Sequence, residues 1–183
     1  MATRQRIARS LNFRSFSGAV RSSGVSFHMG WMTSSGEPVS EDEVMALALK
    51  LAAARVARTD VLTNPAETRR YLMLRMGDLQ HEVFCCLYLD SRHYVIAFDE
   101  LFRGTVDGAS VHPREVVKEA LARNAAAVIL VHNHPSGVAE PSQADELITI
   151  RLKDALGLVD IRVLDHLIVT AGRCVSLAEC GVL

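Results

Sequence analysis

The chain has 183 residues, of which 49% are hydrophobic and 22% are charged, which fits one globular domain or one domain with a short appendage. This composition excludes a disordered or fibrous chain, and no apolar run reaches the roughly 18 residues that a membrane-spanning helix needs. The net charge of −1 is unevenly spread, because residues 1–36 contain five arginines and no acid, whereas residues 37–183 carry all 21 acids against 15 bases. This acidic remainder does not support tight binding of nucleic acid, which stays an open alternative, and no membrane partner is expected.

The N-terminal segment 1–36 is rich in Arg, Ser and Gly and has no sustained hydrophobic period, which predicts a disordered tail. Two other interpretations stay open: an organellar transit peptide, or a translation start that lies later, at Met29 or Met32. The segment lacks the apolar centre of a secretory signal. The chain has four cysteines, none in a Cys-x-x-Cys pair, which is typical of free thiols in a reducing compartment. We therefore expect a cytoplasmic protein.

Two helices are predicted after the tail. Ser40 followed by Glu43 is a capping-box pattern, and it predicts the beginning of an N-terminal helix within residues 37–60. Pro65 predicts the beginning of a second helix, because proline is favoured in the first helical turn. This helix is expected to continue to about Met76, where a Gly-Asp pair ends it.

A β-hairpin is predicted next. Residues 82–89 and 93–101 are rich in β-branched and aromatic side chains, and the Asp-Ser pair between them predicts a turn. Cys85 and Cys86 are adjacent in the first of these strands, so we expect their side chains on opposite faces of the sheet.

The second half of the sequence alternates between helices and strands. Helices are predicted over 113–124 and 142–155, and strands over 126–131, 159–170 and 173–175. The first of these strands is apolar throughout, as is typical of a strand buried on both faces. A strand pair followed by this alternation predicts an α/β fold, a three-layer α/β/α sandwich with a mixed sheet.

The segment that follows the apolar strand carries most of the chemistry. His132 and His134 are two residues apart, so an extended backbone points both imidazoles the same way. Asp145, in the first turn of the next helix, gives a third ligand for Zn²⁺ and leaves a fourth tetrahedral position open for water, as in catalytic zinc sites. Ser142 and Asp145 are equally a helix-capping pattern, so each residue alone has a structural explanation. The combined spacing of His-x-His, seven residues, Ser, two residues and Asp is what indicates a metal site.

This spacing resembles the JAMM (MPN⁺) metalloprotease motif. The wider phrase from His132 to Asp145 is similar to that of the bacterial RadC family, whose members carry this domain. Three further pieces of the sequence are similar to the same family: Gly104-Thr105, Val111-His112-Pro113-Arg114-Glu115 and Leu164-Asp165-His166-Leu167-Ile168.

The resemblance to the RadC family covers about residues 62–183 and implies the fold of the MPN/JAMM and cytidine-deaminase-like proteins. Full-length RadC proteins also carry an N-terminal helix-hairpin-helix region, so the sequence resembles a short form without that region. The expected organisation is a disordered tail over 1–36, an N-terminal helix within 37–60 and an MPN/JAMM domain over 61–183.

The family pattern also implies a glutamate on an early strand, and the matching residue is Glu82. The resemblance implies that Glu82 is the general base, which takes a proton from the zinc-bound water and passes it to the leaving amine. Ser142 is implied as the donor that stabilises the tetrahedral oxyanion. The expected function is that of a zinc-dependent metallopeptidase, which cleaves a peptide or isopeptide amide in an unidentified substrate. No oligomeric state is predicted.

The other histidines allow less specific interpretations. Asp165 and His166 are either a carboxylate–imidazole pair that orients a metal ligand from behind, or a polar pair within a buried strand. His112 precedes a proline at a helix start and is interpreted as a cap. The remaining three are interpreted as surface residues: His28, His81 and His93.

Two alternatives to hydrolysis can be compared with the sequence. The first is a binding module or DNA-repair-associated module that retains the metal site with little activity, which should not need Glu82. The second is a zinc deaminase, which would need a His-x-Glu and a Pro-Cys-x-x-Cys motif. The sequence has neither motif, so this alternative is rejected.

Overall fold

The computed structural model describes residues 31–32, 38–56, 65–104 and 110–183. The predicted disordered tail, 1–36, lies outside the described residues except for Trp31 and Met32. Among the described residues, no helix is both long enough and apolar enough to span a membrane.

The chain divides between Ala48 and Leu49 into two units, which are described separately. Two short antiparallel strands, β1 (Trp31–Met32) and β2 (Pro38–Val39), precede α1 (Glu41–Val56), whose first half belongs to the first unit. The predicted capping box is present at the start of α1. Ser40 N donates to Glu43 Oε2 at 2.9 Å, and Glu43 N donates to Ser40 Oγ at 3.2 Å.

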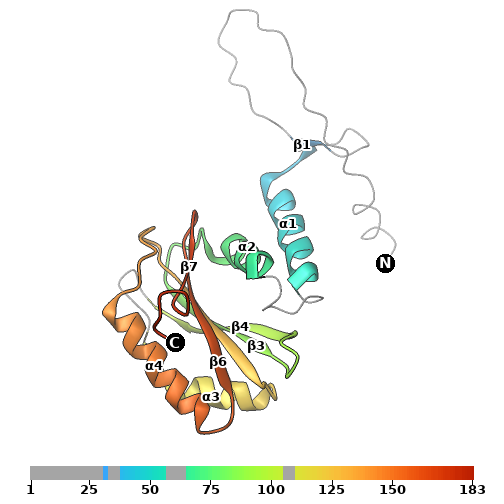
Figure 1. Ribbon diagram of the computed structural model, residues 1–183. Helices are drawn as coiled ribbons and strands as arrows, with labels where there is room; N and C mark the ends of the chain where they lie inside the picture. Colours follow the sequence, from blue (N-terminus) through green and yellow to red (C-terminus); the bar gives the residue numbers. More distant parts are fainter. Residues whose placement is uncertain (1–30, 33–37, 57–64, 105–109) are drawn as a thin grey trace, which may run out of the picture. The chain divides into compact units, whose positions relative to one another are not determined.

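The second unit alternates between strands and helices in the predicted order (Figure 1). Its elements are α2 (Pro65–Met76), β3 (Val83–Leu89), β4 (Val95–Arg103), α3 (Pro113–Ala122), β5 (Ala127–Asn133), α4 (Gln143–Gly157), β6 (Arg162–Val169) and β7 (Cys174–Ser176).

Five strands form one mixed sheet in the order β4-β3-β5-β6-β7. Strand β5 lies in the centre, and all seven of its residues are buried, as its continuous apolar sequence predicts. Strands β5 and β6 are parallel, while the other neighbouring pairs are antiparallel. The parallel pair needs a crossover connection, and α4 supplies it. The loop that leaves β5 therefore has to run from the carboxyl end of the sheet into the start of α4.

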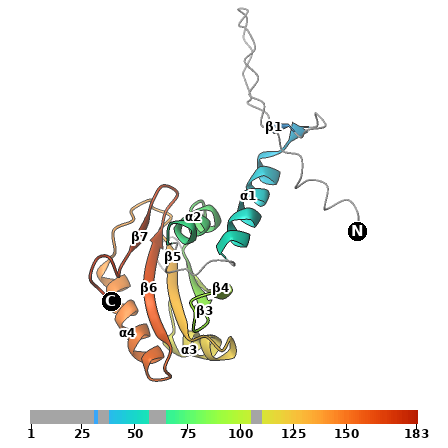
Figure 2. The same ribbon diagram turned by 45° about the vertical axis from the view of Figure 1, so that its right-hand side comes forward.

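Helices cover both faces of this sheet, with α2 on one side and α3 and α4 on the other (Figure 2). Alternate side chains of each strand enter the two cores. Cys85 packs with Leu72 of α2, whereas Cys86 packs with Val116 of α3 and Leu152 of α4. The predicted three-layer α/β fold with a mixed sheet is thus confirmed, as is the placement of the two cysteines on opposite faces.

Helix α2 ends at Met76, as predicted, and the next residue explains why a glycine stands there. A Cβ atom added to Gly77 would lie 2.6 Å from the carbonyl oxygen of Met73 and 3.0 Å from Cα of Ala171. Both are backbone atoms, so the chain can pass at this point only without a side chain.

The largest apolar side chain of α3 does not face the core. Val116 is fully buried, but Leu121 is 54% exposed, and Ala120 occupies the inward position. Val116 and Ala120 are four residues apart and lie on the same face of the helix. Leu121 is five residues after Val116, so its side chain points away from that face.

Candidate metal centre

The candidate site lies at the carboxyl end of β5, where the sequence predicted it. His132 is the sixth residue of β5, and only 1% of its surface is exposed. The chain then leaves the strand, but His134 N still donates to Val169 O of β6 at 2.9 Å. Both histidines are therefore held by the sheet, so the loop between β5 and α4 does not set their positions alone.

Three side chains converge at this point. His132 Nε2 lies 2.9 Å from His134 Nε2 and 3.1 Å from Asp145 Oδ1. His134 Nε2 lies 3.6 Å from Asp145 Oδ2. Among the described residues, these three form the group of His, Cys, Asp and Glu side chains that could hold a metal ion, and their ligand atoms all lie within 4.8 Å of one another.

The ring of His134 is fixed by a backbone carbonyl. Its Nδ1 lies 2.7 Å from Val138 O, and since a carbonyl can only accept, Nδ1 donates. A turn brings the carbonyl back to the ring, because Gly137 N donates to His134 O at 3.0 Å and Gly137 has a φ of +79°, which favours glycine. The remaining nitrogen, Nε2, faces His132 with a free lone pair.

Asp145 is held by the cap of α4. Its Oδ2 accepts from Ser142 N at 2.8 Å and from Ser142 Oγ at 2.6 Å, while Asp145 N donates to Ser142 Oγ at 3.2 Å. The capping interpretation and the ligand interpretation are therefore compatible, since Oδ2 serves the cap and Oδ1 faces His132. The Ser142 hydroxyl proton is directed at Asp145, so it would have to turn away to serve an oxyanion.

Electrostatics favour the charged form of Asp145. Burial alone would raise the pKa of its carboxyl, but the contacts with His132 and Ser142 outweigh burial and hold that pKa well below its ordinary value. Asp145 is therefore a carboxylate at neutral pH, as a metal ligand must be.

The donor set fits a small divalent ion. Two ligands at about 2.0–2.1 Å in tetrahedral geometry lie about 3.3 Å apart, and the separations of 2.9 to 3.6 Å between the three residues are close to this value. Two imidazole nitrogens and one carboxylate oxygen are ligands that zinc accepts, and three protein ligands leave one position open.

Glu82 stands directly before β3 and is not part of the group of three metal-ligand candidates. Phe84 pairs with His132 across β3 and β5, and their rings are stacked with centroids 6.2 Å apart. Alternation along the chain puts Glu82 on the same face as Phe84. Its backbone oxygen accepts from Gly104 N at 2.9 Å, and its side chain is half-buried.

Asn133 positions this segment, a role that the sequence analysis missed. Its Oδ1 accepts from Val83 N at 2.8 Å, and its Nδ2 donates to His81 O at 3.0 Å. This buried amide ties the end of β5 to the residues on both sides of Glu82. The signal in the sequence is a polar residue between two ligand histidines, whose side chain must point to the opposite face of the strand.

His166 lies behind His132. Its Nε2 is 2.8 Å from His132 Nδ1, and its Nδ1 is 2.5 Å from Thr149 Oγ1. Burial lowers the pKa of His166 well below its ordinary value, and the ring is completely buried. The sequence left open whether Asp165 and His166 act together as a pair behind a metal ligand. Only His166 contacts His132, because Asp165 accepts from the backbone N of His166 and not from its ring.

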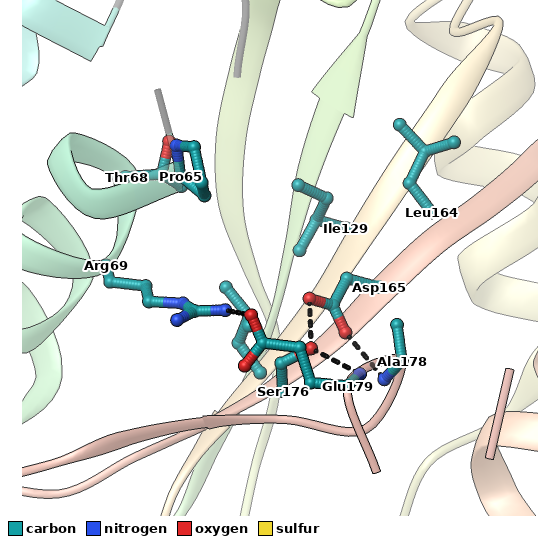
Figure 3. Close-up of a pocket in the computed structure, with 10 residues that line it drawn as sticks. Pro65, Thr68, Arg69, Ile129, Leu164, Asp165, Ser176, Ala178 and Glu179 are labelled. Atoms are coloured by element: carbon teal, nitrogen blue, oxygen red, sulfur yellow. Dashed lines mark hydrogen bonds and ion pairs between the residues drawn. The ribbon is translucent and has the colours of Figure 1, made fainter. Parts of the chain in front are cut away.

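Asp165 belongs to a cavity of about 380 Å³ whose lining includes residues of α2 and the sheet core on that side (Figure 3). Its carboxylate accepts from Ser176 Oγ at 2.7 Å and from Ala178 N at 3.1 Å. An ion pair between Arg69 and Glu179 lies at the same cavity. Asp165 therefore serves the other face of the sheet and not the metal centre.

The remaining histidines also differ in part from expectation. His112 occupies the cap position of α3 but makes no capping side-chain bond, and its ring meets Phe102 edge-on at 5.9 Å. His81 and His93 are both half-buried: the backbone oxygen of His81 accepts from Asn133, and His93 Nε2 lies 3.0 Å from Arg162. His28 lies outside the described residues.

The mixed sheet, its crossover helix and the His-His-Asp cluster at the end of the central strand define an α/β domain of the JAB type. A family model for the RadC-like JAB domain matches residues 62–182. The chain belongs to this family, as the resemblance predicted.

Curated relatives support this assignment. A UPF0758 protein from Nitrosococcus oceani is 70% identical over 126 residues, which are 69% of this chain and 56% of the relative. UPF0758 proteins from Thioalkalivibrio sulfidiphilus and Marinobacter nauticus are 68% and 64% identical, over 57% and 55% of their own lengths. The chain thus spans a little over half the length of these relatives.

Proposed function

We propose that the chain is a zinc-dependent hydrolase that cleaves a peptide or isopeptide amide bond. The observation that carries this proposal is the convergence of His132, His134 and Asp145 within bonding distance of one ion. Three such ligands, with a fourth position open, are typical of catalytic zinc. The JAB-type fold supports the same chemistry, and the substrate is proposed to be a peptide or protein.

Each residue has a role in this proposal. Bound zinc would supply Lewis-acid activation of a water molecule and of the scissile carbonyl. Glu82 takes a proton from the attacking water and delivers it to the leaving amine. Its place two residues before Phe84, the cross-strand partner of His132, supports this role. Ser142 rotates its hydroxyl from Asp145 toward the oxyanion, while its backbone keeps its place in the cap.

The proposed compartment is the cytoplasm. All four cysteines are free, and Cys85 and Cys86 are buried thiols that no disulfide protects. Burial raises the pKa of Cys85 to about 12, so it is inert as a nucleophile. Cys85 is thus not a second candidate for catalysis.

The proposal is tested by comparing the parent chain with Glu82→Gln. Both are expected to bind one zinc ion per chain, whereas only the parent cleaves members of a defined peptide library, and a chelator abolishes that cleavage. Loss of the general base should lower the rate by at least about 100-fold. Glu100→Gln is the matched control, because Glu100 is an exposed glutamate on β4 that pairs with Arg103.

Three results would contradict the proposal. A parent chain that binds no zinc removes its basis. Zinc lost together with activity in Glu82→Gln would make Glu82 a ligand. If the zinc-loaded parent and zinc-loaded Glu82→Gln both cleave no member of the library, the result favours the binding module.

A further inference from the structure

Four groups form a continuous hydrogen-bonded chain behind the metal cluster. His132 Nδ1 lies 2.8 Å from His166 Nε2, His166 Nδ1 lies 2.5 Å from Thr149 Oγ1, and Thr149 Oγ1 lies 2.5 Å from the backbone oxygen of Asp145. His166 and Thr149 are fully buried, so water does not compete for these bonds. The chain connects two ligands of the same cluster, from the ring of His132 to the main chain of Asp145.

The direction of every bond follows from its last member. The carbonyl of Asp145 can only accept, so Thr149 Oγ1 donates its single proton there. Thr149 must then accept from His166, which puts a proton on His166 Nδ1. A neutral imidazole carries one proton, so His166 Nε2 is an acceptor, and His132 Nδ1 donates to it. His132 is left with a free lone pair on Nε2, the atom that faces His134 and Asp145.

The premise that His166 is neutral rests on its surroundings. The ring is completely buried and meets Phe84 edge-on at 5.5 Å. Its two nitrogens face another imidazole and a hydroxyl, so no carboxylate contacts them directly. A buried charge without a partner is costly.

We propose that Thr149 and His166 are positioning residues, which fix the tautomer and the ring orientation of His132 for metal binding. The inference rests on the proposed function only in placing a metal at the cluster. Together with the Val138 carbonyl behind His134, this chain leaves two imidazole lone pairs and a carboxylate oxygen facing one point. A cation at that point satisfies all three.

The opposite direction of the chain is disfavoured by the same geometry. It would place a proton on His132 Nε2, where a metal must bind, and would require Thr149 to donate to His166. The oxygens of Thr149 and of the Asp145 carbonyl would then face each other at 2.5 Å with no proton between them. Such an unpaired buried contact costs free energy. The hydroxyl of Thr149 therefore selects the ligating tautomer of a histidine that it does not touch.

The test measures zinc affinity of the full chain by competition with a chelator, without any substrate. Thr149→Val keeps the shape and removes the hydroxyl, and it should weaken zinc binding by about 10- to 100-fold, the usual cost of losing a partner behind a ligand. Thr149→Ser keeps the hydroxyl and should rescue most of this loss. Thr68→Val is the matched control, because Thr68 is a buried helical threonine on the opposite face of the sheet and should leave affinity unchanged.

A spectroscopic readout separates positioning from mere packing. Nitrogen-15 NMR of the histidine side chains in the zinc-loaded parent should show the proton of both His132 and His166 on Nδ1. Thr149→Val should shift His166 toward the Nε2–H form. Parent-like affinity in Thr149→Val, or a parent His166 protonated on Nε2, would overturn the inference. A parent that binds no zinc would overturn the proposed function. The NMR measurement of the His166 tautomer in that parent would still test the direction of the hydrogen-bonded chain.

Discussion

Each metal-ligand candidate is held by a partner on the side away from the cluster. His134 donates to the Val138 carbonyl, Asp145 accepts from Ser142, and His132 contacts His166. These partners order the ligand atoms before any ion binds, so little side-chain entropy remains to be lost on binding. The cluster should consequently respond sharply to the loss of any one ligand.

Replacing His134 by alanine is expected to weaken zinc binding by more than about 100-fold, since losing only a partner behind a ligand already costs up to that much. The measurement is zinc stoichiometry and affinity after chelator treatment and reloading. His112→Ala serves as the control, because His112 contacts Phe102 and lies outside the cluster. Zinc affinity in His134→Ala equal to that of the parent would show that the ion sits elsewhere.

Asp165 allows a test of buried charge that is separate from the metal. Burial raises the pKa of its carboxyl above the ordinary value, although hydrogen bonds from Ser176 and Ala178 oppose this. The folded chain thus holds a proton on Asp165 more readily than the unfolded chain. The stability contribution of this residue is fully present below about pH 4 and is lost as the pH rises through the raised pKa.

Asp165→Asn does not titrate, so its free energy of unfolding minus that of the parent should rise between about pH 4 and pH 7. The comparison uses urea unfolding of chelator-treated protein, so that metal binding does not add its own pH dependence. A difference that falls over this range would mean that the hydrogen bonds outweigh burial and that the pKa of Asp165 is lowered.

Among the elements, the end of α2 and the end of α4 both carry a glycine, but for different reasons. Gly77 stands where the backbones of Met73 and Ala171 leave no room for a Cβ atom. Gly157, the last residue of α4, has open space around its Cα. The two positions therefore form a matched pair for a single substitution.

Gly77→Ala should lower the free energy of unfolding by about 1–3 kcal/mol, the usual cost of forcing an extra group into a packed site. Gly157→Ala should leave stability unchanged or raise it by up to about 1 kcal/mol, because alanine is the better helix former. Urea unfolding of the two variants and the parent checks both values. Equal stability of the two variants would mean that the backbone at Gly77 yields without cost.

For the whole molecule, local signals predicted most of the fold. The proline at the start of α2, the apolar run of β5 and the Ser142 cap each mark an element by a rule that acts over a few residues. In the hairpin, three of the four predicted strand ends were off by one or two residues, and β4 runs to Arg103. Its pairing with β3, which continues to Val83, sets that end, and pairing partners are not visible in a single strand.

In the candidate site, too, some contacts follow from local spacing and others depend on strand pairing. His132, His134, Ser142 and Asp145 follow one another in a fixed spacing, so the sequence predicted that they meet. The contact of His166 with His132 depends on the register of β5 against β6, and the role of Asn133 depends on that of β3 against β5. Neither register can be read from local spacing, which is why the pair Asp165 and His166 stayed ambiguous and Asn133 was missed.

The short spacing from His132 to Asp145 has a consequence for the order of folding. Contacts between residues close in sequence form quickly, because little loop entropy is lost, while contacts between distant segments form late. The three metal-ligand candidates can therefore meet once β5 and the start of α4 are in place, before β6 brings His166 behind His132. In the proposed function, the ion would thus be able to bind before the sheet is complete.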